Sequence, residues 1–143
     1  MTSDEIRAFL DRFMQAWEKQ DIEALGACYC DDCVVVSPMF HTLNGRARVE
    51  RSYEELFHAF SNQKVRVDDI VIGNDEPARA VVVWTVQSTH VGEIFGMPGT
   101  GKRIERTLAY ILTLRDGRIA KEVRMYDFTN MLMQLGVLRA KAV

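Results

Sequence analysis

The sequence predicts a single α+β domain over residues 1–143, and two observations support that prediction. Helical apolar patterns fill the N-terminal part of the chain up to Phe60, whereas long strand-like runs fill most of the remainder. In addition, Asp116-Gly117 separates two alternating runs, which is typical of a tight β-hairpin because both turn positions need a positive φ. Helices followed by an antiparallel meander pack on one face of the sheet. We therefore expect a cone: three N-terminal helices on a curved, mostly antiparallel sheet, a pocket inside, and a short C-terminal helix.

The first helix has the clearest signal. Thr2 and Glu5 fit a capping box, with Ser3 as the alternative cap. The apolar residues that follow recur at helical spacing, which predicts an amphipathic helix over Ser3–Lys19. They are Ile6, Phe9, Leu10, Phe13, Met14 and Trp17.

Two further helices and one short strand follow. Asp21 is a good N-cap for a helix over Ile22–Tyr29, which the Asp31-Asp32 pair ends. A short strand over Val34–Ser37 then stops at Pro38. After a turn at Asn44-Gly45, an apolar stripe predicts the third helix over Arg46–Phe60.

The rest of the chain is predicted to be sheet. Lys64–Ile72 alternates imperfectly and is expected to bulge at Asp68-Asp69. Arg79–His90 is apolar on both faces near its middle, which indicates a central strand. A glycine-rich loop over residues 91–102 leads to the hairpin strands Arg106–Arg115 and Arg118–Asp127, and a helix over Phe128–Leu135 ends at Gly136.

A two-residue hairpin loop fixes which residues face each other in the last two strands. Counting from Arg115 opposite Arg118 places Tyr110 opposite Val123, Leu108 opposite Met125, and Arg106 opposite Asp127. Directly opposed residues share a sheet face. Asp127 is therefore expected on the face that the helices cover, beside an apolar wall, and the alternate residues of both strands are expected on the other face. The wall is Leu108, Tyr110, Val123 and Met125, and the outer residues include Thr107, Thr113, Glu122 and Arg124.

The bulk composition excludes several classes of function. The chain is 48% hydrophobic and 27% charged, with a formal net charge of −2 and no basic run, so nucleic acid is not an expected partner. No apolar stretch is long enough to span a bilayer, and the acidic N-terminus is unlike a signal peptide. We therefore expect no membrane association and a cytoplasmic location.

Several short motifs occur in a recognisable order between residues 89 and 136. They are Thr89-His90-Val91-Gly92, Pro98-Gly99-Thr100-Gly101, Asp116-Gly117-Arg118-Ile119, then Asp127, and Gln134-Leu135-Gly136. In that order and spacing they resemble the SnoaL-like polyketide cyclases. That family belongs to the superfamily that shares the cone fold of nuclear transport factor 2 and ketosteroid isomerase. The resemblance implies the cone fold, and it also points to a homodimer.

The resemblance gives Asp127 a specific role. The aspartate ahead of the last helix acts in the cyclases as acid/base in an intramolecular aldol closure, and Asp127 matches that position. Such chemistry requires neither a cofactor nor a metal, since the protein positions the substrate and stabilises an enolate. Two other interpretations of Asp127 stay open: its side chain caps the following helix, or it pairs with Arg106.

His90 is the second candidate catalytic residue. It lies at the end of the central strand, on the face of Trp84 and Val86, where it could donate a hydrogen bond to a substrate oxygen. The alternative is a histidine that satisfies backbone groups of the adjoining loop. Trp17, Tyr53 and Trp84 are candidate pocket residues, although an aromatic on a helix stripe is first of all a core residue.

Cys28, Cys30 and Cys33, with His41 downstream, could supply four metal ligands. Their spacing matches no common zinc module, and an odd number of close thiols is typical of a reducing compartment. We therefore expect ordinary thiols and no metal.

Two classes of function remain. The first is a cofactor-free cyclase or isomerase that acts on a carbonyl-activated small molecule. The second is a non-catalytic module that binds an apolar small molecule or serves only in dimerisation. A deep pocket with Asp127 in its wall would favour the enzyme, and a pocket filled by aromatic side chains would favour the module.

Overall fold

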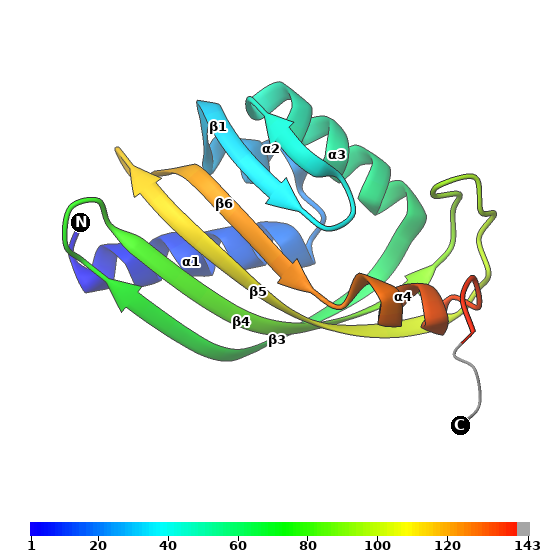
Figure 1. Ribbon diagram of the computed structural model, residues 1–143. Coiled ribbons are helices and arrows are strands. Elements are labelled where there is room, and N and C mark those ends of the chain that lie inside the picture. Colours follow the sequence, from blue (N-terminus) through cyan, green and yellow to red (C-terminus); the bar gives the residue numbers. More distant parts are fainter. Residues whose placement is uncertain (140–143) are drawn as a thin grey trace.

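The computed structural model describes residues 1–139 and confirms the predicted α+β cone, with helices packed on a curved, unclosed sheet (Figure 1). The helices of this part are α1 (Ser3–Glu18), α2 (Ile22–Ala27), α3 (Arg46–Ala59) and α4 (Phe128–Gln134). The strands are β1 (Tyr29–Ser37), β2 (His41–Asn44), β3 (Phe60–Gly73), β4 (Arg79–His90), β5 (Arg103–Arg115) and β6 (Arg118–Tyr126).

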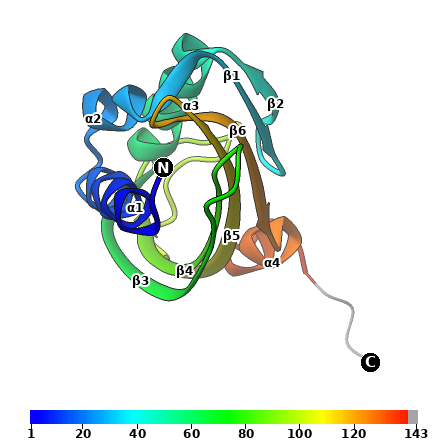
Figure 2. The same cartoon turned by 90° about the vertical axis from the view of Figure 1, so that its left-hand side faces the viewer.

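The sheet has the order β2-β1-β6-β5-β4-β3. All neighbours pair antiparallel except β1 and β6, which are parallel. Seen from the end of α1, the sheet curls around that helix, with α2 and α3 along the top (Figure 2). α4 lies at the opposite end, against β5. This curvature makes the inner face of the sheet the wall of the cone.

The N-terminal boundaries agree with the sequence patterns except around residues 28–44. The capping box of Thr2 and Glu5 is present, and Asp21 caps α2. The second helix is shorter than predicted, because β1 starts at Tyr29 and continues through Asp31-Asp32, whose side chains point to solvent. β2 was not predicted; it is a short edge strand that pairs with β1.

A bulge in β6 overturns the predicted hairpin register. Arg115 does face Arg118 and Leu114 faces Ile119, but Thr113 then faces Lys121, so Ala120 is an extra residue. Because side chains alternate between faces, one inserted residue moves every later side chain to the other face. Glu122 and Arg124 therefore point into the cone, and Val123 and Met125 point away from it, the reverse of the prediction.

Aromatic side chains fill the closed part of the cone. The ring of Trp84 lies 5.1 Å from those of both Trp17 and Tyr110, in edge-to-face contacts. Phe13 adds contacts to Trp84 and Tyr29. These rings are almost completely buried, so this part of the interior is packed core. None of the helices between residues 1 and 139 is long and apolar enough to cross a membrane.

Candidate functional site

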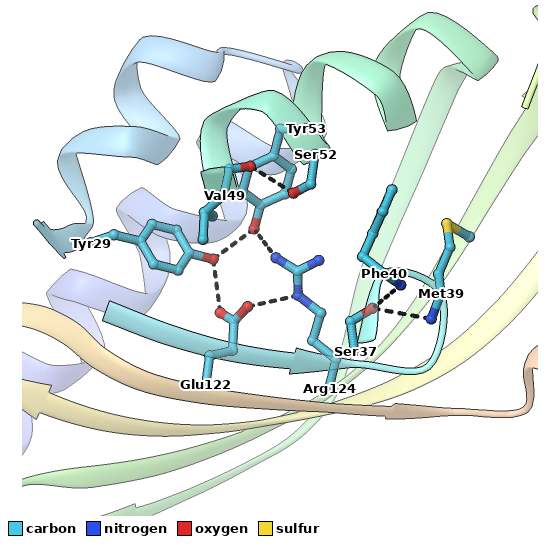
Figure 3. A network of polar contacts seen from close by, with 9 residues as sticks. All are labelled: Tyr29, Ser37, Met39, Phe40, Val49, Ser52, Tyr53, Glu122 and Arg124. Atoms are coloured by element: carbon cyan, nitrogen blue, oxygen red, sulfur yellow. Dashed lines mark hydrogen bonds and ion pairs between the residues drawn. The ribbon is translucent and has the colours of Figure 1, made fainter. Parts of the chain in front are cut away.

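An apolar pocket opens at the end of the cone where α4 lies. Its volume is about 370 Å³, and it lies between the β1–β2 turn, the loop over residues 91–102 and the C-terminal segment. The hydroxyl oxygen of Ser37 accepts hydrogen bonds from the backbone N–H groups of Met39 and Phe40 and so fixes the turn (Figure 3). The residues that line this mouth pocket are Pro38, Met39, His41, Phe95, Met97, Phe128, Leu132 and Val137.

Asp127 lies at the start of α4, one residue before the pocket-lining Phe128. Its side chain is exposed, and Oδ1 accepts a hydrogen bond from the Asn130 backbone N–H at 2.8 Å. The contact that the capping interpretation requires is therefore present. No ion pair joins Asp127 to Arg106 in the described chain, because the bulge at Ala120 takes Asp127 out of the predicted register. The acid/base role of Asp127 stays a prediction.

His90 holds the glycine-rich loop and still keeps a free nitrogen. Nδ1 accepts from the Thr100 backbone N–H at 3.2 Å and lies 3.0 Å from the Thr100 hydroxyl. Because Nδ1 is an acceptor there, the proton of the neutral ring is assigned to Nε2. Nε2 is buried and meets no acceptor among residues 1–139. His90 thus satisfies the loop, as the alternative interpretation expected, and also presents a donor to the interior.

The predicted pocket residues do not line the mouth pocket. Trp17, Tyr53, Trp84, Leu108 and Tyr110 are buried inside the cone. Val123 and Met125 were assigned to the same wall, but the bulge at Ala120 turns them outward, and the Met125 side chain is 56% exposed. The placement of these two residues was therefore wrong.

A buried polar network, which the sequence patterns did not predict, results from the bulge at Ala120. Glu122 and Arg124, both on β6, form an ion pair in which Arg124 Nε donates to Glu122 Oε2 at 2.7 Å (Figure 3). The Tyr29 hydroxyl donates to Glu122 Oε1 at 2.9 Å and lies 2.7 Å from the Tyr53 hydroxyl. Arg124 Nη2 donates to that second hydroxyl at 3.2 Å, which closes the ring.

Both oxygens of the Glu122 carboxylate and both tyrosine hydroxyls in this network have a hydrogen-bond partner. Burial raises the pKa of Tyr29 and of Tyr53 well above the ordinary value, so both hydroxyls stay protonated and act as donors. The guanidinium of Arg124 also lies over the rings of Tyr53 and Tyr110, at 5.1 and 5.4 Å from their centroids. A closed network of this kind joins β1, α3 and β6.

Comparison with known families identifies the chain. The family model of the SnoaL-like polyketide cyclases matches residues 7–135. The chain belongs to the SnoaL-like polyketide cyclase family. A search of curated proteins finds no match to this SnoaL-like chain.

Solved structures share the fold of this SnoaL-like protein. IdmH from Streptomyces antibioticus, a proposed polyketide cyclase, is 26% identical with a TM-score of 0.75, over 92% of this chain and 98% of IdmH. AclR from Streptomyces galilaeus, a proposed hydroxylase, is 24% identical with a TM-score of 0.83. The match covers 97% of this chain and 89% of AclR. A protein with a ketosteroid isomerase-like fold from Catenulispora acidiphila, solved with trimethylamine, is 16% identical with a TM-score of 0.74. The match covers 91% of this chain and 93% of that protein.

The three cysteines of the SnoaL-like chain are buried free thiols. Cys28 Sγ donates to the Ala24 carbonyl oxygen, and Cys30 Sγ donates to that of Arg115. Burial raises the pKa of the Cys33 thiol to about 11, which disfavours the thiolate that a metal requires. Residues 1–139 contain no cluster of three or more His, Cys, Asp or Glu side chains placed to hold an ion.

We predict that the purified protein carries no stoichiometric zinc. Cys28 and Cys30 donate to backbone carbonyls, and burial raises the pKa of Cys28 and of Cys33, which disfavours the thiolates that a zinc ion needs. Elemental analysis of protein prepared without chelator checks this. About one zinc per chain, lost in a Cys30→Ser or Cys33→Ser variant, would overturn the prediction.

Proposed function

We propose that the protein is a cofactor-free enzyme that cyclises or isomerises a carbonyl-activated small molecule, with Asp127 as acid/base. The observation that supports it is the place of Asp127: it directly precedes Phe128 in the wall of the apolar mouth pocket, and only its Oδ1 has a hydrogen-bond partner in the described chain. The second carboxylate oxygen is thus available to take a proton. The family match supports the same class of chemistry.

The proposed reaction is a proton transfer followed by bond formation within one molecule. Asp127 removes a proton from the carbon next to a carbonyl group, which leaves an enolate. In a cyclisation, the enolate carbon attacks a second carbonyl carbon of the same substrate, and the resulting alkoxide takes the proton back from Asp127. In an isomerisation, the proton returns to a different carbon. The Nε2–H of His90 is the donor proposed for the enolate oxygen.

The first step can be tested without knowing the natural substrate. A panel of aromatic β-diketones and β-keto esters is incubated with the protein in heavy water, and exchange of the hydrogens between the carbonyl groups is followed by NMR. Proton abstraction at the pocket predicts exchange faster than in buffer for those compounds that bind. Bound compounds that exchange only at the buffer rate would contradict the enzyme proposal.

One observation favours the second class of function, a non-catalytic module. The interlocked rings of Trp17, Trp84 and Tyr110 fill the closed part of the cone, so a ligand in the mouth pocket would not reach a deep cavity there. A ligand held only in the mouth pocket could be bound and released unchanged. This alternative predicts binding of apolar compounds in the same NMR experiment with no acceleration of exchange.

We also propose that the protein is a homodimer through the outer face of the sheet. Glu122 and Arg124 were predicted to lie on that face, but the bulge at Ala120 removes both from it and adds Val123 and Met125. It therefore joins these two apolar residues to Ala109 and Ile111 on β5. An apolar patch of this kind is typical of an interface between protomers.

Light scattering at tens of micromolar tests the dimer. We expect a mass near twice 16.3 kDa. A Met125→Lys substitution places a charge in the patch and should shift the population toward monomer, because burying an unpaired charge is costly. Monomer at all concentrations in the unaltered protein would contradict the proposal.

A cytoplasmic location completes the proposal. Cys28, Cys30 and Cys33 lie close together in the sequence, are buried and form no disulfide, as is usual in a reducing compartment. Recovery of the native protein from an extracellular or periplasmic fraction would contradict this location.

A further inference from the structure

Arg106 is a buried cation without a counter-charge. It projects from β5 into the cone and is only 5% exposed. Its Nε and Nη2 meet no hydrogen-bond acceptor among residues 1–139, and Nη1 has only the Met131 sulfur, at 4.0 Å. No carboxylate of the described chain forms an ion pair with it. Because a buried charge without a partner is strongly unfavourable, this arrangement requires an explanation.

Arg124 lies on the same face of the sheet and, unlike Arg106, forms an ion pair. Each guanidinium lies over two aromatic rings. Arg124 lies over Tyr53 and Tyr110, and Arg106 lies over Phe60 and Tyr126, 5.7 Å from both ring centroids. Arg124 also has the carboxylate of Glu122. Arg106 has the same aromatic setting and lacks the acid. Burial lowers the pKa of Arg106, but an arginine remains charged near neutral pH.

Arg106 lies directly behind the wall of the mouth pocket. The Tyr126 ring contacts both the guanidinium of Arg106 and the ring of Phe128, which lines the pocket. On the other side Arg106 touches Met131, whose neighbour in sequence, Leu132, also lines the pocket. Met131 and Leu132 are successive residues of α4, so the helix that contacts the guanidinium also contributes to the pocket wall, and methionine is an apolar side chain that adapts easily.

Two further buried polar groups near Arg106 have no hydrogen-bond partner in the described chain, and both can donate a hydrogen bond. The Phe60 ring contacts both the Arg106 guanidinium and the His90 ring, at 5.7 and 5.3 Å. His90 Nε2 and the Ser88 hydroxyl are buried without a partner in the described chain, and both project from the inner face of β4 beside Arg106. A group rich in acceptor oxygens would satisfy all three side chains.

We propose that Arg106 binds the carboxylate of an acidic small molecule whose apolar body occupies the mouth pocket. The planar guanidinium presents its free Nε–H and Nη2–H on one edge, which matches the two oxygens of a carboxylate. This proposal rests on the proposed function, which places the ligand in the mouth pocket. It narrows the class of ligand, because the free acid rather than its neutral ester is the form that is recognised.

Isothermal titration with matched acids and esters tests this proposal. The probes are benzoate and 2-naphthoate, each compared with its methyl ester at pH 7. For the unaltered protein we expect at least one acid to bind about tenfold more tightly than its ester, since hydrogen bonds to charged groups are the stronger ones. This comparison does not depend on the folding of any variant.

Arg106→Met is the matched variant, because it keeps the length and apolar stem of the side chain and removes the charge. It should weaken binding of that acid by about tenfold or more and leave the ester nearly unchanged. Without ligand it should melt no lower than the unaltered protein, since it removes an unpaired buried charge. Arg12→Met, at an exposed arginine of α1, is the control and should leave the affinity for the acid unchanged.

Three results would overturn the proposal: no acid binds at millimolar concentration, acid and ester bind equally, or Arg106→Met binds the acid as before. If Arg106→Met does not fold, Arg106→Gln replaces it. The outcome is independent of catalysis. Acid binding that needs Arg106, together with only the buffer rate of exchange for carbonyl compounds that bind, would uphold this inference and reject the enzyme proposal.

Discussion

Replacing Asp127 with asparagine is expected to lower turnover by about 10²–10⁴-fold while leaving the fold intact. The amide oxygen of asparagine can still accept the hydrogen bond from the Asn130 backbone N–H, which Asp127 Oδ1 now accepts. Asparagine and aspartate are about equally good N-caps, whereas alanine costs on the order of 1 kcal/mol. Stability should therefore fall only in Asp127→Ala, and the rate should fall in both variants. The rate of proton exchange on the best β-dicarbonyl compound measures the first effect, and urea unfolding measures the second.

The chain provides a matched control for this substitution. Asp21 is also an exposed N-cap aspartate, and its Oδ1 accepts from the Ala24 backbone N–H at 3.1 Å, at the start of α2. Asp21→Asn makes the same chemical change at the other end of the chain and should alter neither rate nor stability. If Asp127→Asn exchanges the compound as fast as the unaltered protein, Asp127 is only a cap, and the catalytic proposal ends there.

Local patterns were sufficient to predict most of the elements. The bounds of β4, Arg79–His90, agree residue for residue, because its apolar run is flanked by turn residues on one side and glycines on the other. The expected irregularity at Asp68-Asp69 is present as a register shift in β3. Gly136, predicted to end α4, adopts a φ of +82°, which favours glycine. In each case the determining residues are close together in the sequence.

Which side chains of β6 point into the cone depends on one residue that no local sequence pattern indicates. Ala120 forms the bulge of β6, yet it is neither glycine nor followed by a turn signal. Alternation alone favoured Val123 and Met125 as inner residues, because a buried Glu-Arg pair is unfavourable unless partners are supplied. Those partners, Tyr29 and Tyr53, come from distant parts of the chain; Tyr29 and Glu122 are 93 positions apart. A hairpin count cannot detect such a tertiary contact.

The second large effect is expected in this network. Arg124→Met leaves the Glu122 carboxylate buried with only the Tyr29 hydroxyl as donor, and breaking a buried ion pair in this way costs about 3–5 kcal/mol. In a protein of this size that is a fall of roughly 10 °C or more in melting temperature. Urea unfolding followed by circular dichroism measures the loss. Arg115→Met is the control on the neighbouring strand, because Arg115 pairs with Asp32 at the surface, where little change is expected.

A double variant separates loss of the pair from loss of packing. Adding Glu122→Gln to Arg124→Met makes the buried group neutral while its oxygen still accepts from Tyr29, so the double variant should be more stable than Arg124→Met alone. If Arg124 contributed only packing against Tyr53 and Tyr110, the second substitution would bring no recovery. A double variant that is no more stable than Arg124→Met would therefore show that the charge of Glu122 is not what makes the single substitution costly. Recovery would show that the loss in Arg124→Met comes from the Glu122 charge, which the bulge at Ala120 turns into the core and which Arg124 compensates.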